Sequence, residues 1–293
     1  MTRPRYVLVT AAYNEERHIA DTLRSVVNQT LTPRRWVVVS DGCTDRTDEI
    51  VEKFADEHPF IELLRVQKAD DHNFANKVRA LRRGFGRLAG LEYDFIGVLD
   101  ADLSFEPDYF ERLLERLASS PRLGVAGGNI EQLVDGTFVP RLKDLNSVAG
   151  AVQLLRRDCF EQTGGLPALR YGGEDAAMEI AARMHGWETR TFPELRVVHF
   201  GLVGAGTGGP VKARMQWGRR NFNLGYHPLF QLARCAYRVQ ERPYVLASLA
   251  ELAGFIVGKV QDREPSVDPE VVHYLRREQL GKLRHLFKVN RSK

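Results

Sequence analysis

Short apolar runs alternate with amphipathic stretches along the first hundred residues. Apolar runs with the length of buried strands lie at residues 6–12, 36–40 and 95–99, and residues 61–66 are a further predicted strand. Three stretches between them have helical apolar spacing, at residues 19–29, 48–57 and 73–88. Strands that alternate with helices at this spacing indicate βαβ units. The pattern predicts an α/β fold with a mainly parallel central sheet and helices on both faces.

Polar residues follow three of the predicted strands. Asn14 and Glu15 come after the first run, Asp41 ends the second, and Asp100 and Asp102 follow the run at 95–99. The carboxyl ends of parallel strands share one edge of a sheet, and ligands of open α/β sheets bind there. We therefore expect these side chains to form one polar rim.

The pair Asp100 and Asp102 predicts a cation site. Two carboxylates at the end of a buried strand are costly without a positive partner. Hard divalent cations such as Mg²⁺ or Mn²⁺ prefer oxygen ligands, and they use one or two carboxylates together with phosphate oxygens. The alternatives are that Asp102 caps the helix starting near Pro107, or that both acids are solvated loop charges.

The turn after the first strand excludes two common nucleotide sites. Neither G-x-G-x-x-G nor G-x-x-x-x-G-K-[ST] follows it, so a nicotinamide-dinucleotide fold and a P-loop are not supported. A nucleotide would be recognised by acids instead. The carboxylate of Asp41 could accept hydrogen bonds from a base N–H or from ribose hydroxyls.

Length and cysteine content bound the class of protein. The 293 residues, 43% of them apolar, predict one main domain with an appendage. The three cysteines form no C-x-x-C pair, which favours a reducing compartment and argues against structural zinc. No signal-peptide apolar segment precedes the first strand, so we expect a cytoplasmic protein.

Charge is distributed unevenly along the chain. Residues 211–293 contain 16 Lys/Arg and 7 Asp/Glu, a net charge of +9, whereas residues 1–210 have a net charge of −5. A basic C-terminal part suits an anionic partner such as a membrane surface or a phosphorylated ligand. No zinc-finger, RRM or basic-zipper pattern is present, so we expect no nucleic-acid partner.

Four motifs together resemble a known family. They are AAYNEE at 11–16, SDGCTDRT at 40–47, NKVRALRRG at 76–84 and LDAD at 99–102. In this order they are similar to the donor half of a family 2 glycosyltransferase, which has the Rossmann-like GT-A fold. The resemblance implies a catalytic domain at residues 1–225, followed by a basic, mainly helical extension at residues 226–293.

The resemblance also implies roles at the rim, where a nucleotide-diphospho-sugar donor would lie. The implied contacts are Ala12, Tyr13 and Glu15 with the nucleoside, Asp41 with the base, Lys77 with the base or phosphates, Asp100 with the ribose side, and Asp102 with the metal. The sequence departs from the family at two positions. Ala12 replaces the usual proline, and Ser40 replaces an acid.

Glu174 and Asp175 precede an amphipathic helix predicted at residues 176–185. Acids at a helix N-terminus can be simple capping residues, worth about 1 kcal/mol. The sequence GGED nevertheless resembles the acceptor motif of the family. This implies that Asp175 is the general base, with Glu174 as its support or as an acceptor contact.

His199 ends another predicted strand, and the glycine-rich segment 201–209 follows it. A histidine there is commonly structural, but the family resemblance implies that it helps hold the metal or the diphosphate. The glycines predict a mobile lid that closes over a bound donor.

A basic helix is predicted after the glycines. Its segment QWGRR, residues 216–220, resembles the Q-x-x-R-W segment of processive family members. This places Arg219 and Arg220 near the donor diphosphate and Trp217 on the acceptor side; the alternative is a solvated basic face. Because the several membrane spans of those members are missing, we expect single-sugar addition.

Two C-terminal stretches favour helices. Residues 244–260 are the most apolar, but Glu251 divides them and they are short for a bilayer span, so a core or interfacial helix is expected. The helix opened by Asp268 and Pro269 is basic and amphipathic. It fits an anionic membrane surface, or it docks on the catalytic domain.

These observations predict a metal-dependent inverting transferase of single sugars. The expected donor is a nucleotide diphosphate sugar, with UDP favoured, and the expected acceptor is a saccharide or lipid-linked saccharide of polysaccharide or glycoconjugate biosynthesis. The expected location is the cytoplasmic face of the membrane. The alternatives are a sugar-nucleotide pyrophosphorylase, a phosphatase that uses Asp100 and Asp102, and a nucleotide-sugar-binding protein without turnover.

Overall fold

The computed structural model describes residues 3–67, 73–134, 137–140, 144–201, 209–240 and 245–289. The chain forms two compact units. The first comprises residues 1–168 and 174–201, and the second comprises residues 169–173 and 202–293. Each unit is described below by itself.

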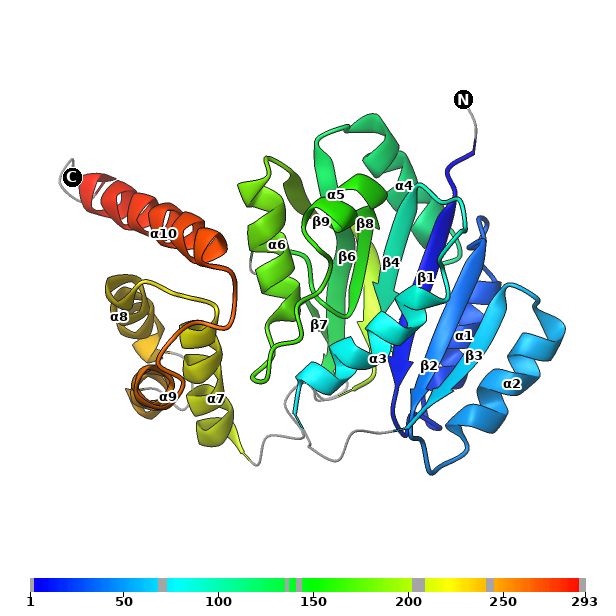
Figure 1. Ribbon diagram of the computed structural model, residues 1–293, viewed down its shortest axis with the longest axis horizontal. Coiled ribbons are helices and arrows are strands. Elements are labelled where there is room, and N and C mark those ends of the chain that lie inside the picture. The colour runs from blue at the N-terminus through cyan, green and yellow to red at the C-terminus, as the bar shows by residue number, and fades with distance from the viewer. Residues whose placement is uncertain are drawn as a thin grey trace. The chain divides into compact units, whose positions relative to one another are not determined.

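The first unit is built on one twisted sheet of nine strands in the order β3-β2-β1-β4-β8-β6-β9-β5, with β7 paired to β6 (Figure 1). The strands are β1 (Tyr6–Ala12), β2 (Arg35–Asp41), β3 (Ile61–Val66), β4 (Phe95–Leu99), β5 (Leu103–Phe105), β6 (Leu123–Val134), β7 (Thr137–Pro140), β8 (Val152–Arg156) and β9 (Glu188–His199). Strands β1 to β4 are parallel, as predicted.

In the second half of this sheet, the sequence predicted only the strand that ends at His199, and it predicted none of the strand pairing. Strand β8 runs antiparallel to both β4 and β6, while β9 is parallel to β6 and antiparallel to β5. This arrangement brings the end of β9 beside the segment that follows β4, since His199 pairs with Leu103. The antiparallel half therefore places a residue from late in the chain at the polar rim.

Helices cover both faces of the sheet, because the strand residues alternate between two cores. Tyr6, Leu8 and Trp36 pack with α1 (Ile19–Val27), α2 (Thr47–Glu57) and α4 (Tyr109–Ser119). Val7 and Val37 pack on the other side with α3 (Ala75–Gly86), α5 (Arg157–Gln162) and α6 (Glu174–Met184). Near-continuous apolar strands are required when a sheet is buried on both faces. The predicted α/β fold is confirmed (Figure 1).

The second unit is helical. Its helices are α7 (Pro210–Asn223), α8 (Pro228–Tyr237), a short 3₁₀ turn η2 (Arg238–Gln240), α9 (Val245–Gln261) and α10 (Pro269–Val289). Helices α7 and α9 pack so closely that a Cβ added at Gly218 would collide with the Glu251 carbonyl, and one added at Gly254 would collide with the Met215 carbonyl. In the described part of the chain, no helix is both long and apolar enough to cross a membrane.

Helix α10 packs its apolar side into the second unit. Val272, Leu275 and Leu283 are buried, and Val272 covers Gly225. The Arg276 guanidinium donates a hydrogen bond to the Gly225 carbonyl. The apolar side of α10, which was predicted to meet either a membrane or the catalytic domain, is thus occupied by contacts within the second unit.

Candidate active site

Asp100, Asp102 and His199 form a compact cluster at the carboxyl end of β4. One ligand atom from each lies within 4.8 Å of the others. His199 Nε2 is 3.1 Å from Asp102 Oδ2, and the Phe200 N–H donates to the Asp102 carbonyl at 3.0 Å. A Cβ at Gly201 would collide with Asp102 Oδ2, so the backbone at Gly201 passes directly against this carboxylate. The structure brings together two acids and a histidine that lie about 100 positions apart in the sequence.

The donor set fits a divalent cation. Two carboxylates and one imidazole match the ligand preferences of Mn²⁺, and the oxygens also suit Mg²⁺. Gln132 lies behind the histidine, with its amide nitrogen 3.5 Å from His199 Nδ1 and 2.9 Å from the Gly201 carbonyl. Such an outer partner fixes the orientation of a ligating ring. Sequence reasoning missed Gln132, because only the pairing of β6 with β9 places it opposite His199.

The ionisation of the cluster reflects its burial. Burial opposes charge on Asp102, but the hydrogen bond and charge of His199 outweigh it and lower the Asp102 pKa. At Asp100 burial dominates and raises the pKa, although the Lys77 ammonium opposes the rise. Burial lowers the His199 pKa less than Asp102 raises it, so that pKa lies above its usual value. A group of acids held this way has a strong electrostatic preference for a bound cation.

Glu15 extends the acidic rim from the end of β1. Burial, followed by the charges of Asp102 and Asp100, raises its pKa to about 7. Its backbone N–H donates to Thr47 Oγ1 at 2.8 Å, and Thr47 Oγ1 in turn donates to Asp45 at 2.6 Å. The loops after β1 and β2 are therefore held together by their own side chains, which sets the position of Glu15.

Lys77 supplies the positive charge on the opposite side of Asp100. It projects from α3, and its Nζ lies 2.5 Å from Asp100 Oδ1. Burial works against the lysine charge, but the carboxylates of Asp100 and Glu174 raise its pKa. Lys77 is thus a cation positioned between the rim and the acids that open α6.

Glu174 and Asp175 are the first two residues of α6. Asp175 Oδ1 accepts a hydrogen bond from the Ala176 N–H at 2.8 Å, and burial followed by the charge of Asp175 raises the Glu174 pKa. A Cβ at Gly150 would lie 2.8 Å from Asp175 Oδ2, so the loop before β8 passes close against this carboxylate.

Glu179 anchors that loop, and sequence reasoning missed it. Its buried carboxylate, one turn beyond Asp175, accepts hydrogen bonds from the Val148 N–H and the Ser147 hydroxyl. In the same loop, the Ala151 carbonyl accepts a hydrogen bond from the Asp100 N–H at 2.8 Å. One loop therefore contacts both Asp100 and Asp175. The one sequence signal for this anchor is an acid, Glu179, within the predicted helix at residues 176–185.

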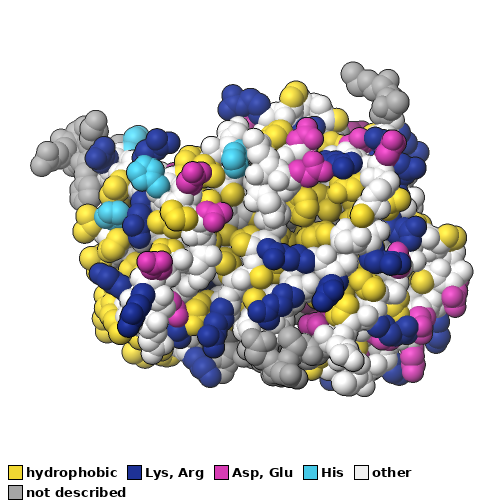
Figure 2. Space-filling model, viewed as in Figure 1, with side chains coloured by type: hydrophobic (Ala, Val, Ile, Leu, Met, Phe, Trp, Pro, Cys, Tyr) yellow, Lys and Arg dark blue, Asp and Glu magenta, His cyan; other side chains and the backbone are white. Residues whose placement is uncertain are grey.

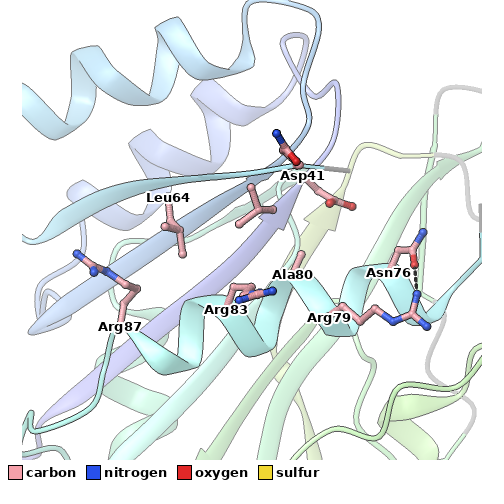
Figure 3. Close-up of a pocket in the computed structure, with 9 residues that line it drawn as sticks. Asp41, Leu64, Asn76, Arg79, Ala80, Arg83 and Arg87 are labelled. Carbon is pink, nitrogen blue, oxygen red and sulfur yellow. Dashed lines mark hydrogen bonds between the residues drawn. The ribbon is translucent and has the colours of Figure 1, made fainter. Parts of the chain in front are cut away.

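A groove of about 740 Å³ opens beside Asp41, between α3 and the strands β2 and β3. Figure 3 shows Arg87 at one end of the groove, Arg83 in its middle, and Arg79 beside Asn76 at the other end, with Asp41 across from α3. Arg79 donates to Asn76 Oδ1 at 2.7 Å, and Arg87 pairs with Glu62. Arg83 makes no hydrogen bond or ion pair with any residue that the structure describes. These arginines are a further set that sequence reasoning did not assign to the site.

The remaining predicted donor contacts at the rim lie at the end of β1. Tyr13 is exposed, whereas Ala12 is buried and its carbonyl accepts from the Cys43 thiol at 3.4 Å. Asn14 adopts a left-handed backbone with φ of 55°, and its side chain accepts from the Thr44 N–H. These contacts join the AAYNEE and SDGCTDRT motifs in one structure.

Three predicted site residues belong to the second unit. Arg219 donates two hydrogen bonds to Asp262, at 2.8 and 2.9 Å, and stacks on the Tyr171 ring. Trp217 is covered by the guanidinium groups of Arg214 and Arg238. The buried Nε of Arg220 has no hydrogen-bond partner among the described residues. Their roles toward donor and acceptor stay predictions, as does the lid, whose residues 202–208 lie outside the described ranges.

A protein-family model, that of glycosyl transferase family 2, matches residues 7–167, which are more than half of the chain. The chain belongs to this family. The resemblance in the four sequence motifs is thereby confirmed, and the matched residues contain the rim from Ala12 to Asp102. The chain thus carries a family 2 glycosyltransferase domain.

Two curated relatives are synthases of one polysaccharide. The poly-beta-1,6-N-acetyl-D-glucosamine synthase of Staphylococcus epidermidis is 24% identical over 229 residues, covering 71% of this chain and 52% of that protein. The synthase of Staphylococcus aureus strain COL is 28% identical over 145 residues, covering 50% of this chain and 31% of that protein. The chain spans about half the length, or less, of these relatives.

Two solved structures share the fold. The mannosyltransferase PcManGT from Pyrobaculum calidifontis, in complex with GDP-Man and Mn²⁺, aligns with a TM-score of 0.60 at 17% identity, over 90% of this chain and 89% of that one. Residues 1–349 of S. aureus TarS, in complex with UDP-GlcNAc, align with a TM-score of 0.55 at 15% identity, over 87% and 72%. At these identities the similarity concerns the fold.

Proposed function

We propose that this protein is a metal-dependent inverting glycosyltransferase. It moves a single sugar from a nucleotide diphosphate sugar, with UDP as the preferred nucleotide, to a saccharide acceptor. The observation that carries the proposal is the cluster of Asp100, Asp102 and His199 at the end of β4, with Lys77 against Asp100. The membership in family 2 supports the reaction class.

Asp102 and His199, with Asp100 beside them, would hold a divalent cation, Mg²⁺ or Mn²⁺. When bound, such a cation neutralises the negative charge that develops on the leaving diphosphate. PcManGT was solved in complex with GDP-Man and Mn²⁺, and this supports a metal-dependent reaction here. Lys77 adds a second positive charge on the Asp100 side, and Glu15 contributes a carboxyl with a pKa of about 7 to the same rim.

Asp175 is proposed as the general base. The acceptor hydroxyl oxygen forms a bond to the anomeric carbon while the bond from that carbon to the diphosphate oxygen breaks. The hydroxyl proton passes to the Asp175 carboxylate, and the bonding electron pair leaves with the nucleoside diphosphate. Attack from the face opposite the diphosphate inverts the anomeric configuration. Glu174, on the same helix turn, supports the base or contacts the acceptor.

The groove beside Asp41 is proposed to receive the nucleoside of the donor. Asp41 provides an acceptor for a base N–H, and the arginines of α3 provide donors for base carbonyls. TarS was solved with UDP-GlcNAc, and the two curated relatives are named as N-acetylglucosamine polymer synthases. These names support UDP as the preferred donor nucleotide.

The acceptor is proposed to be a lipid-linked saccharide in polysaccharide or glycoconjugate biosynthesis. The enzyme would then work as a peripheral protein on the cytoplasmic face of an anionic membrane. The net charge of +9 over residues 211–293 supports this location.

Calorimetric titration of UDP, GDP and dTDP tests the donor site. Each nucleotide is added to the wild type in Mn²⁺, to the wild type in EDTA, and to Asp102→Ala in Mn²⁺. The expected result is UDP binding that weakens at least tenfold in EDTA and in the variant. Asp108→Ala, on an acid outside the cluster, is the matched control. Nucleotide binding whose affinity depends on neither the metal nor Asp102 would contradict the proposal. Absence of nucleotide binding would favour the phosphatase alternative.

A further inference from the structure

The second unit exposes an apolar face that the proposed reaction does not use. Among the described residues, ten of the sixteen exposed large hydrophobic side chains belong to this unit, and eight of these ten lie on α8 or α9. Figure 2 shows apolar side chains gathered over the part of the molecule that α8 and α9 occupy, with Lys and Arg among them. A concentration of this kind marks an interaction surface more often than scattered single residues do.

The clearest part of this face is a stripe along α9, here called the α9 stripe. It consists of Val245, Leu246, Leu249, Ile256 and Val260, which are 52% to 69% exposed. Spacings of four and seven residues keep these side chains on one side of a helix. The 17 residues of α9 give the stripe a length of about 25 Å.

The opposite side of α9 is fully engaged. Glu251, Gly254 and Gly258 face inward, where the glycines allow contact with α7. Glu251 is 1% exposed and lies 3.1 to 3.6 Å from three arginines, on α7, α8 and η2. The polar side of α9 is thus fixed inside the unit, so the helix cannot rotate to hide its apolar side.

The charges around the stripe select the kind of partner. Glu251 is the one acidic residue of α8 and α9, and it is buried. Lys259 is exposed on α9, and Arg263 is exposed just after it. The whole second unit contains 17 Lys/Arg and 7 Asp/Glu, a net charge of +10. A second copy would oppose like charges across a twofold interface, whereas an anionic lipid surface would be attracted.

We propose that the α9 stripe inserts into the interfacial region of an anionic lipid bilayer. The helix lies in the plane of the membrane, its apolar side chains enter the headgroup boundary, and the cations of the unit contact lipid phosphates. This deepens the membrane association in the proposed function and assigns it to α9, whose apolar side is exposed, rather than to α10, whose apolar side is buried.

Vesicle sedimentation of the 293-residue chain tests the assignment. The probes are vesicles of phosphatidylcholine alone and vesicles that also contain about 30% phosphatidylglycerol. The anionic lipid gives the second set a negative surface that attracts basic proteins. The variants are Leu249→Glu and Ile256→Glu. Val139→Glu, at an exposed apolar position of β7 in the first unit, is the matched control. We expect wild type and control to bind the anionic vesicles and each α9 variant to bind at least tenfold more weakly.

Two further measurements keep the test decisive. Circular dichroism melting of each variant must match the wild type, since the substitutions are at exposed positions. Transfer to a water-soluble saccharide should be unchanged in the α9 variants, so a failure of the membrane assignment is distinguishable from a failure of the transferase proposal. Vesicle binding that survives both substitutions overturns the assignment. A wild-type dimer that both substitutions dissociate, without vesicle binding, overturns it in favour of a second copy.

Discussion

The two units bury charge in opposite ways. At the rim of the first unit, five carboxyl groups surround the Lys77 ammonium and the His199 ring; the five are Glu15, Asp100, Asp102, Glu174 and Asp175. In the second unit, Glu251 is the one buried carboxylate among the described residues, and it lies within 3.6 Å of three arginines. The first cluster has an excess of negative charge that a cationic ligand can neutralise. The charge of Glu251 in the second cluster is already neutralised by the arginines. The second cluster is therefore a structural ion-pair network, whereas the first is a candidate binding site.

The largest expected effect is at the proposed base. Asp175→Asn removes the proton acceptor but keeps the shape of the side chain, so the transfer rate should fall by about 10²- to 10⁴-fold. Nucleotide binding should change little, because Asp175 is assigned to the acceptor. Initial rates and calorimetry measure the two effects. Asp158→Asn, at an exposed acid of the same unit, should keep full activity. Turnover in Asp175→Asn within threefold of the wild type would exclude this residue as the base.

The second prediction contrasts the two buried clusters directly. Glu251→Gln leaves three arginines without their counter-charge, and we expect it to reduce the free energy of unfolding by about 3 kcal/mol or more. Glu15→Gln, measured without metal at pH 8, should leave stability unchanged or raise it, because burial and the charges of Asp102 and Asp100 raise the Glu15 pKa to about 7 and so disfavour its ionised form. Urea unfolding followed by circular dichroism compares them, with Glu270→Gln as an exposed control. Equal effects of the two substitutions would remove the distinction between the clusters.

The third prediction concerns the buried Glu179. Burial raises its pKa to about 8, above the value of 4.5 for an ordinary glutamate, so the folded state holds the proton more tightly than the unfolded chain. The stability from this group is therefore fully present below pH 4.5 and is lost as the pH rises through 8.

Glu179→Gln should remove this pH dependence. Between pH 5 and 7 the wild type should lose about 3 kcal/mol relative to the variant, measured by urea unfolding at each pH. Glu179→Ala should also lower kcat, because the loop from Ser147 to Ala151 contacts both Asp100 and Asp175, while Glu179→Gln should retain most activity. Parallel pH profiles for wild type and Glu179→Gln would show that the carboxyl does not titrate in this range.

The smallest effect is expected in the arginine groove. Arg83→Gln removes a donor that has no described partner, and we expect nucleotide affinity to weaken by about three- to fivefold, which corresponds to about 1 kcal/mol. Calorimetry with UDP measures the change. Lys53→Gln, an exposed position on α2, controls for the loss of one charge. An unchanged dissociation constant would place the nucleoside away from Arg83.

The sequence determined the parallel half of the sheet and its rim. Strand β1 begins and ends where its apolar run does, and the polar residues of AAYNEE, SDGCTDRT and LDAD follow directly after their strands. Local patterns suffice there because a strand buried on both faces is continuously apolar, and its end is marked by the first charged residue. The carboxylate pair at the end of β4 and the family could be predicted from these motifs, while the metal role of the pair stays a prediction.

Tertiary structure alone decided how distant residues complete the site. His199 faces Asp102 because β9 pairs with β5, and Gln132 faces His199 because β6 pairs with β9. Likewise, both α9 and α10 carry apolar residues at helical spacing, yet those of α10 are buried and the α9 stripe is exposed. Pairing between distant strands and the choice of buried helix face depend on contacts over long sequence separations, which no local pattern encodes.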